Sequence, residues 1–163
     1  MSANGSVNII VGYNNSLNTG TGGTLTDVFN DNLSLNFGPG TAANQMDQPW
    51  SHTNTLTNAA DTFTLSALVG PGAATTNQAR TRAFYIRNLA TVDGNVLVVT
   101  PGATHPLSTI FGTGGITIPA GGAALFLAPL TIGYAVVAST TDEITVTATG
   151  TVPYKIASFG VSV

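Results

Sequence analysis

The side chains best suited to chemistry in this chain include a run of oxygen-bearing residues in its first quarter. The run contains Asp27, Asn30, Asp31 and Asn32. Carboxylate and amide oxygens are the ligands that calcium prefers. The spacing lacks the glycine and the distal glutamate of an EF-hand loop, and a turn rich in Asx residues accounts for the run equally well. We therefore predict no metal site.

The two histidines, His52 and His105, show no catalytic or zinc-binding pattern. A zinc site needs further ligands at short spacings, and neither histidine has them. Members of a Ser–His–Asp triad lie far apart in sequence, and no nucleophile-elbow motif anchors one here. The chain has no cysteine, which rules out thiol catalysis and thiolate metal sites. We expect no enzymatic activity and no cofactor.

Charged residues are unusually scarce. Asp, Glu, Lys and Arg make up 7% of the chain, against about a quarter in an ordinary soluble domain. Binding to nucleic acid or to an anionic membrane surface requires a basic patch, and the net charge here is −3. We therefore predict no nucleic-acid partner and no membrane partner. The N-terminus does not resemble a secretory signal, and no apolar stretch approaches the ~20 residues of a transmembrane helix.

Three of the four cations, Arg80, Arg82 and Arg87, lie within eight positions of one another. In a chain so poor in charge they are candidates for ion pairs with acidic groups of a neighbouring subunit. The alternative is pairing within the chain, with Asp27, Asp31, Asp47 or Asp61.

Trp50 is the only tryptophan and lies in a polar stretch. An exposed tryptophan stacks on a sugar or anchors a protein partner. The alternative is that Trp50 packs over one end of the fold. Both interpretations stay open, and Trp50 is included among the interface candidates.

The elements that must position these residues are strands. Polar and apolar residues alternate over 33–37, 62–67 and 144–149, the period of a half-buried strand. Three further runs, 96–99, 123–128 and 134–138, are apolar without alternation, which favours coverage on both faces, by the second sheet and by a neighbouring subunit. Alternatively, their small residues simply tolerate exposure. No helical period of convincing length appears.

Turn residues separate these strands. Asp93-Gly94 lies between 83–89 and 95–100 and predicts a tight hairpin. In the last strand, from Val152, the apolar residues occupy even positions up to Ile156 and odd positions from Phe159. A one-residue bulge near Ala157-Ser158 would place both sets on the same face.

The first sixty residues differ from the rest, because Asn and Gly dominate 14–23 and 39–58 and only 7–13, 25–29 and 33–37 look regular. They form either an arm across neighbouring subunits or long surface loops. We expect the strand containing Val7, Ile9 and Val11 to pair with a sheet edge, on its own domain or on a neighbour. The prediction is an all-β fold: an antiparallel, jelly-roll-like β-sandwich at 61–163 and a loop-rich N-terminal segment at 1–60, which together form one domain.

The second half of the chain resembles the β-sandwich structural proteins of tailed bacteriophages, which include the cement, or decoration, proteins of the capsid. The resemblance covers about residues 80–163. It is carried by Phe84-Tyr85-Ile86-Arg87-Asn88-Leu89, Asp93-Gly94, Ile116-Thr117-Ile118-Pro119-Ala120-Gly121-Gly122, Thr141-Asp142-Glu143-Ile144-Thr145-Val146 and Gly150-Thr151-Val152-Pro153-Tyr154-Lys155-Ile156.

The resemblance implies a non-enzymatic virion protein on the capsid exterior that stabilises the shell. Its implied partners are the major capsid protein and further copies of itself, with a trimer as the expected homo-oligomer. Two alternatives stay open. One is a tail or fibre component that binds a host surface, and the other is a carbohydrate-binding β-sandwich module.

Overall fold

The computed structural model describes residues 4–18, 24–69 and 75–163, and the side chains of residues 12–18, 24–27 and 29 are not part of the description. Strands make up 62% of the described residues, against 20–25% in typical globular proteins. In the described ranges, helix is limited to α1 (Ser108–Phe111) and a 3₁₀ turn, η1 (Leu65–Ala67). The prediction of an all-β fold with almost no helix is confirmed.

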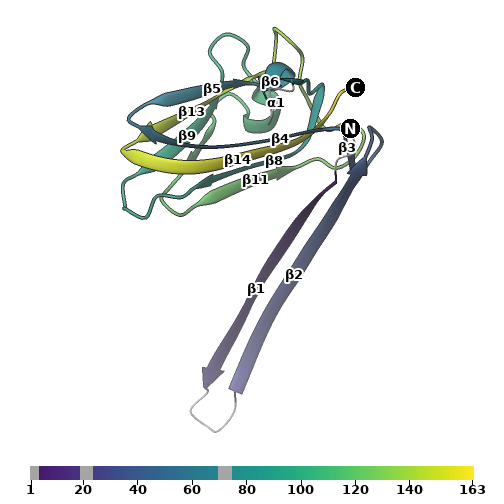
Figure 1. The fold of residues 1–163 in the computed structure, drawn as a ribbon. Helices are drawn as coiled ribbons and strands as arrows, with labels where there is room; N and C mark the ends of the chain where they lie inside the picture. The colour runs from purple at the N-terminus through teal and green to yellow at the C-terminus, as the bar shows by residue number, and fades with distance from the viewer. Residues whose placement is uncertain (1–3, 19–23, 70–74) are drawn as a thin grey trace.

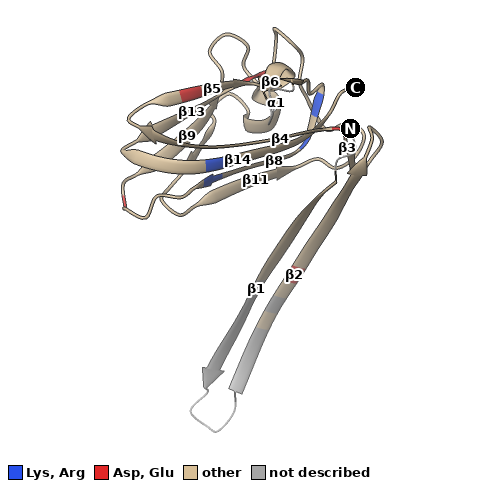
Figure 2. Ribbon diagram, viewed as in Figure 1, with Lys and Arg blue, Asp and Glu red and all other residues tan. Residues whose placement is uncertain are grey.

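Two antiparallel sheets form the body (Figure 1). Sheet I has the order β11 (Ala123–Leu127), β8 (Arg80–Asn88), β14 (Thr151–Val161), β4 (Gln48–Thr57), and β12 (Tyr134–Ala135) also pairs with β8. Sheet II has the order β10 (Ile116–Ile118), β9 (Val96–Pro101), β13 (Glu143–Thr149), β5 (Ala60–Thr64). Two two-residue strands, β6 (Leu68–Val69) and β7 (Thr75–Thr76), pair with each other, and a third, β3 (Gln45–Met46), pairs in parallel with the end of β2 (Thr24–Pro39). Charged residues are sparse on both sheets (Figure 2).

The connections carry the chain back and forth between the sheets. β4 and β5, β8 and β9, β10 and β11, and β13 and β14 each lie in different sheets. The predicted Asp93-Gly94 hairpin is therefore wrong, although a turn is present and Gly94 adopts a φ of +88°. The buried Asn88 side chain stabilises this crossing: its amide donates to the carbonyls of Asn95 (3.0 Å) and Ile118 (3.1 Å) and accepts from the Ala90 N–H.

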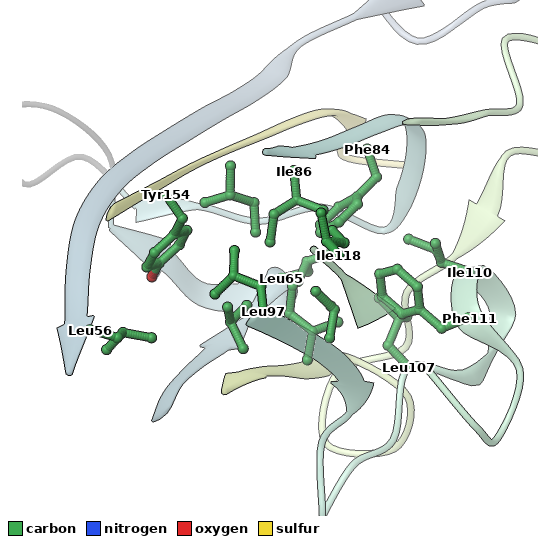
Figure 3. Close-up of a cluster of buried hydrophobic side chains, with 14 of the residues drawn as sticks. Leu56, Leu65, Phe84, Ile86, Leu97, Leu107, Ile110, Phe111, Ile118 and Tyr154 are labelled. Carbon is green, nitrogen blue, oxygen red and sulfur yellow. The ribbon is translucent and has the colours of Figure 1, made fainter. Parts of the chain in front are cut away.

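Both sheets contribute to one hydrophobic core (Figure 3). Sheet I supplies Phe84, Ile86, Val152, Tyr154 and Ile156, and sheet II supplies Leu97, Val99, Ile144 and Val146. The helix α1 adds Phe111, whose ring meets those of Phe84 and Phe126 edge to face, with centroids 5.3 and 5.2 Å apart. Because the alternate residues of each strand enter this core, the period of two in the sequence reflects one-sided burial.

Of the apolar runs that we expected to be covered on both faces, 96–99 and 134–138 are covered on one face by this chain, whereas in 123–128 Ala124 and Phe126 pack against the core and Leu127 packs against a second cluster. In β9, Leu97 and Val99 are fully buried, whereas Val96 and Val98 are half-buried. In the run 134–138, Val136 is buried and Val137 is 51% exposed. Coverage of the second face by a neighbouring subunit stays a prediction.

The last strand, β14, keeps its alternation where a bulge was predicted. Val152, Tyr154, Ile156 and Ser158 are all buried on the core side. The predicted bulge near Ala157-Ser158 is wrong, because the register shifts between Phe159 and Gly160 and the extra residue is Arg82, on β8.

The N-terminal segment is a single long hairpin and not a set of loops. β1 (Gly5–Asn18) pairs over its whole length with residues 24–37 of β2 (Thr24–Pro39), and the two strands project away from the two sheets (Figure 1). The predicted pairing of β1 with the edge of another sheet is wrong within this chain, since its partner is β2. The body also begins before residue 61, because β4 pairs with β14 over its whole length.

Candidate interaction site on the N-terminal hairpin

The projecting hairpin has one mainly apolar face and one mainly polar face. Directly paired residues share a face of an antiparallel ladder. One face carries the pairs Val7↔Leu35, Ile9↔Leu33 and Val11↔Asp31, and the other carries Ser6↔Asn36, Asn8↔Ser34 and Ile10↔Asn32. On the polar face, the Ser34 hydroxyl donates to Asn8 Oδ1 at 2.8 Å. The hairpin is thus amphipathic, and its apolar face carries the carboxylate of Asp31.

The base of the hairpin packs on the outer face of sheet I, the face turned away from the core. Val7 and Leu35 contact a second cluster that contains Phe37, Met46 and Phe159. The Phe37 and Phe159 rings meet edge to face, with centroids 5.6 Å apart. Phe159 is therefore apolar because the hairpin covers it, which is the physical reason for the parity change in the sequence.

Gly5 allows this close approach. A Cβ atom at this position would lie 2.7 Å from Met46 Cε and 3.0 Å from the Phe159 ring, inside van der Waals contact. The hairpin base is therefore held tightly on the body.

Farther along, the apolar face of the hairpin loses its cover. Ile9 is half-buried, Leu33 is 40% exposed and Val11 is 53% exposed. The mainly polar face also carries two exposed apolar side chains, Ile10 (78%) and Val28 (54%). A two-stranded hairpin is marginally stable alone in water, so this exposed apolar strip indicates an interaction surface.

A groove of about 290 Å³ runs between the hairpin base and the outer face of sheet I. Its apolar lining comes from Val7, Ala83, Tyr85, Leu125, Ala157 and Phe159. The groove continues the contact that the hairpin base makes with Ala83 and Phe159.

Arg87 and Lys155 lie directly opposite each other on β8 and β14, and both are exposed. Figure 2 shows the two basic positions side by side on these strands. Among the residues that the structure describes, neither forms a salt bridge with a carboxylate. Like charges in directly opposed positions are unfavourable, so this pair is a positive site without a counter-charge in the described chain. Sequence reasoning selected Arg87 but missed Lys155, because only the strand register brings them together.

Arg82 is fully buried and serves the fold. Its guanidinium donates to the carbonyls of Ala42 (2.7 Å), Thr41 (2.6 Å) and Pro129 (3.1 Å). Burial lowers the pKa of Arg82, the charge of Arg80 lowers it further and Asp47 opposes both. The expectation that Arg82 faces a neighbouring subunit is not met in this chain, because its guanidinium is enclosed.

Arg80 is half-buried, and its guanidinium donates to the carbonyl of Ile132 at 2.8 Å. Neither Arg80 nor Arg82 forms a salt bridge with a described carboxylate, so intrachain pairing with Asp47 or Asp61 is not seen either. Asp27 lies outside the described side chains.

Trp50 is 5% exposed and lies in β4. Its Nε1 donates to the carbonyl of Val69 at 3.2 Å, and its ring packs against His52 and Phe63. The interpretation as an exposed sugar-stacking platform is therefore wrong.

Tyr154 connects the core to a polar group at the β4–β5 edge of the body. Its hydroxyl donates to Asp61 Oδ2 at 2.6 Å, and Asn54 Nδ2 donates to the same oxygen at 2.8 Å. Burial raises the pKa of Tyr154 well above its ordinary value, and the hydrogen bond and charge of Asp61 raise it further.

This raised pKa predicts a stability change at alkaline pH. The unfolded tyrosine titrates near 10.0, so the stabilisation from neutral Tyr154 is complete below about pH 10 and declines above it. At neutral pH, Tyr154→Phe is expected to lower the free energy of unfolding by about 1.5–3 kcal/mol. Denaturant titrations should show this difference shrinking between about pH 10 and pH 11. A constant difference across that range would contradict the assignment.

His105 approaches two carboxylates, with its Nδ1 3.6 Å from Asp142 Oδ1 and 3.5 Å from Glu143 Oε1. The Ser66 hydroxyl donates to Asp142 and not to the imidazole. A catalytic triad requires the serine to contact the imidazole, and in this group the serine contacts the carboxylate. The group links the segments around Ser66, His105 and Asp142.

The described residues contain no group of three or more His, Cys, Asp or Glu side chains that could hold a metal ion. The oxygen-rich run is not an Asx turn either, because Asn30, Asp31 and Asn32 lie within β2. No helix in the described ranges is both long and apolar enough to cross a membrane.

Comparisons with known proteins found no match among family models, curated proteins or solved structures. The functional inference consequently depends on the residues, their pairing and their exposure.

Proposed function

We propose that this chain is a non-enzymatic structural subunit of a virion, a cement protein that binds the exterior of a phage capsid as a homo-oligomer. The observation that carries the proposal is the amphipathic hairpin that projects from the body with its apolar face uncovered. A projecting apolar element suits attachment to repeated neighbours, because many weak contacts add up on a symmetric lattice.

The strand order supports the same class of protein. In chain order, the eight main strands are β4, β5, β8, β9, β10, β11, β13 and β14, and they form sheets with the orders first-eighth-third-sixth and second-seventh-fourth-fifth. We propose that the body is a β-sandwich of the jelly-roll type, an architecture common in viral capsid and lectin domains. Of these two uses, the lectin one has less support, since the only tryptophan is buried.

The outer face of sheet II is also suited to a neutral protein contact. Thr145 on β13 lies between Thr62 on β5 and Thr100 on β9, and the hydroxyls of Thr62 and Thr145 lie 3.3 Å apart. β-branched side chains lose little conformational freedom on contact. Such a face can form hydrogen-bonded interfaces without charged groups.

The test compares the mass of the protein in solution with its presence on purified particles. We expect an oligomer larger than the 16.5 kDa chain, a trimer in our proposal, and labelling of the capsid exterior by an antibody against the protein in electron micrographs. Labelling of the tail would instead support the tail or fibre alternative. A protein that is monomeric at micromolar concentration and absent from particles would contradict both.

A further inference from the structure

We infer that the distal part of the hairpin of one copy docks on the outer face of sheet I of a second copy, with Asp31 placed against Arg87 and Lys155. The inference rests on the homo-oligomer of the proposed function and is independent of capsid attachment. It identifies the partner of the hairpin and the surface that receives it.

The hairpin already makes this kind of contact at its base. Within one chain, Val7 and Leu35 pack near Ala83 and Phe159 on the outer face of sheet I. The next pair on the same hairpin face, Ile9 and Leu33, is only partly covered. Because β1 has 14 residues and a strand rises about 3.3 Å per residue, the hairpin reaches well beyond its own body.

The receiving face presents cross-strand rows in a regular order. Starting beneath the hairpin base, the rows are Phe159/Ala83/Leu127, then Ala157/Tyr85/Leu125, then Lys155/Arg87/Ala123. The middle row is half-buried and lines the groove. The face therefore changes from apolar to positive within two residues along β8 and β14.

The hairpin shows the complementary order at the same spacing. On its apolar face, the pair Ile9/Leu33 is followed two residues later by Val11/Asp31. A two-residue step is about 6.6 Å on both surfaces. The exposed Asp31 carboxylate of a second copy, with Val11 beside it, can therefore meet the two cations of the Arg87 row, which lies beyond the part of the face that the first copy's own hairpin base covers.

The charges favour a second copy over an unrelated partner. The chain has only four cations, and Arg87 and Lys155 form an exposed like-charged pair without a counter-ion in the described residues. Asp31 is the exposed carboxylate among the described side chains of the hairpin. Within one chain the hairpin projects away from the two sheets (Figure 1), so we assign the carboxylate to a second copy. Charge complementarity of this kind sets the register of an interface.

Charge reversal followed by charge exchange tests the inference. Asp31→Arg and the double variant Arg87→Glu/Lys155→Glu are each expected to weaken self-association about tenfold in sedimentation velocity. Combining all three changes should restore most of the lost association, because the pair re-forms with exchanged signs. The matched control is Asp93→Arg, which makes the same charge change in an exposed turn of the body and should leave association unchanged. Equal effects of Asp31→Arg and Asp93→Arg, or no recovery in the combined variant, would overturn the inference.

Crosslinking supplies a second readout, since the native chain has no cysteine. Chains carrying Asp31→Cys are mixed with chains carrying Lys155→Cys and treated with a short bis-maleimide. Mixed covalent dimers are expected, and they should be scarce when the second chain carries Thr147→Cys, on the exposed face of sheet II. Equal yields would overturn the docking surface. If the protein crosslinks but is absent from particles, the result supports this inference and contradicts the capsid function. If particles are labelled but no crosslinking occurs, the result supports the capsid function and overturns this inference.

Discussion

Replacing Arg82 with alanine is expected to lower the free energy of unfolding by about 3–5 kcal/mol. The side chain is fully buried and is a donor to the carbonyls of Thr41, Ala42 and Pro129. The substitution removes three charge-assisted hydrogen bonds and leaves a cavity in a packed site. The substitution also removes the free-energy cost of burying the guanidinium charge. This gain offsets only part of the loss, because the three carbonyls remain enclosed without their donors.

Arg80→Ala is the matched control. Arg80 lies on the same strand, is half-buried and makes one hydrogen bond, to the carbonyl of Ile132. Its loss should cost about 1 kcal/mol or less. Urea denaturation at one fixed protein concentration measures both variants. Equal destabilisation by the two substitutions would show that the buried guanidinium has no special structural role.

Deleting residues 1–13 is expected to abolish self-association and retention on particles while lowering the melting temperature by only about 4–8 °C. The main core contains no residue from this segment. What the body loses is the contact of Val7 with the second cluster. What the assembly loses is one strand of the hairpin and with it the apolar face.

A point variant distinguishes a specific effect from the exposure of an unpaired β2. Val11→Ser keeps the hairpin length and removes an apolar side chain that is 53% exposed, so its melting temperature should match that of the native protein. Association should nevertheless fall. Full retention of the truncated chain on particles would mean that the hairpin is dispensable and that the interface lies within residues 80–163.

Local patterns in the sequence were sufficient for the class of fold. In β13, Ile144 and Val146 are buried whereas Thr147 is exposed, as the alternation predicts. This succeeds because the side-chain direction in a strand depends only on the neighbouring residues. The strands of the hairpin were harder to recognise, since Asn and Gly have low strand propensity and the ladder depends on pairing between β1 and β2.

Sheet membership was decided by the tertiary structure. The residues around Asp93-Gly94 form a turn, as their types require, yet β8 and β9 enter different sheets. A turn of a few residues has similar local chemistry whether it joins paired strands or crosses the core. The choice depends on distant contacts, such as the bond from Asn88 to the Ile118 carbonyl.

The composition of the chain by itself determined the scarcity of charge, the absence of thiol chemistry and the strand-rich class, because these depend on residue types and local periodicity. The tertiary structure alone decided that Arg82 and Trp50 are buried and that Arg87 faces solvent beside Lys155. Burial and cross-strand pairing depend on which distant segment covers a residue. Strand register, the Arg82 bulge and the packing of the hairpin base on Phe159 determine that cover, and none of these is encoded within a single strand.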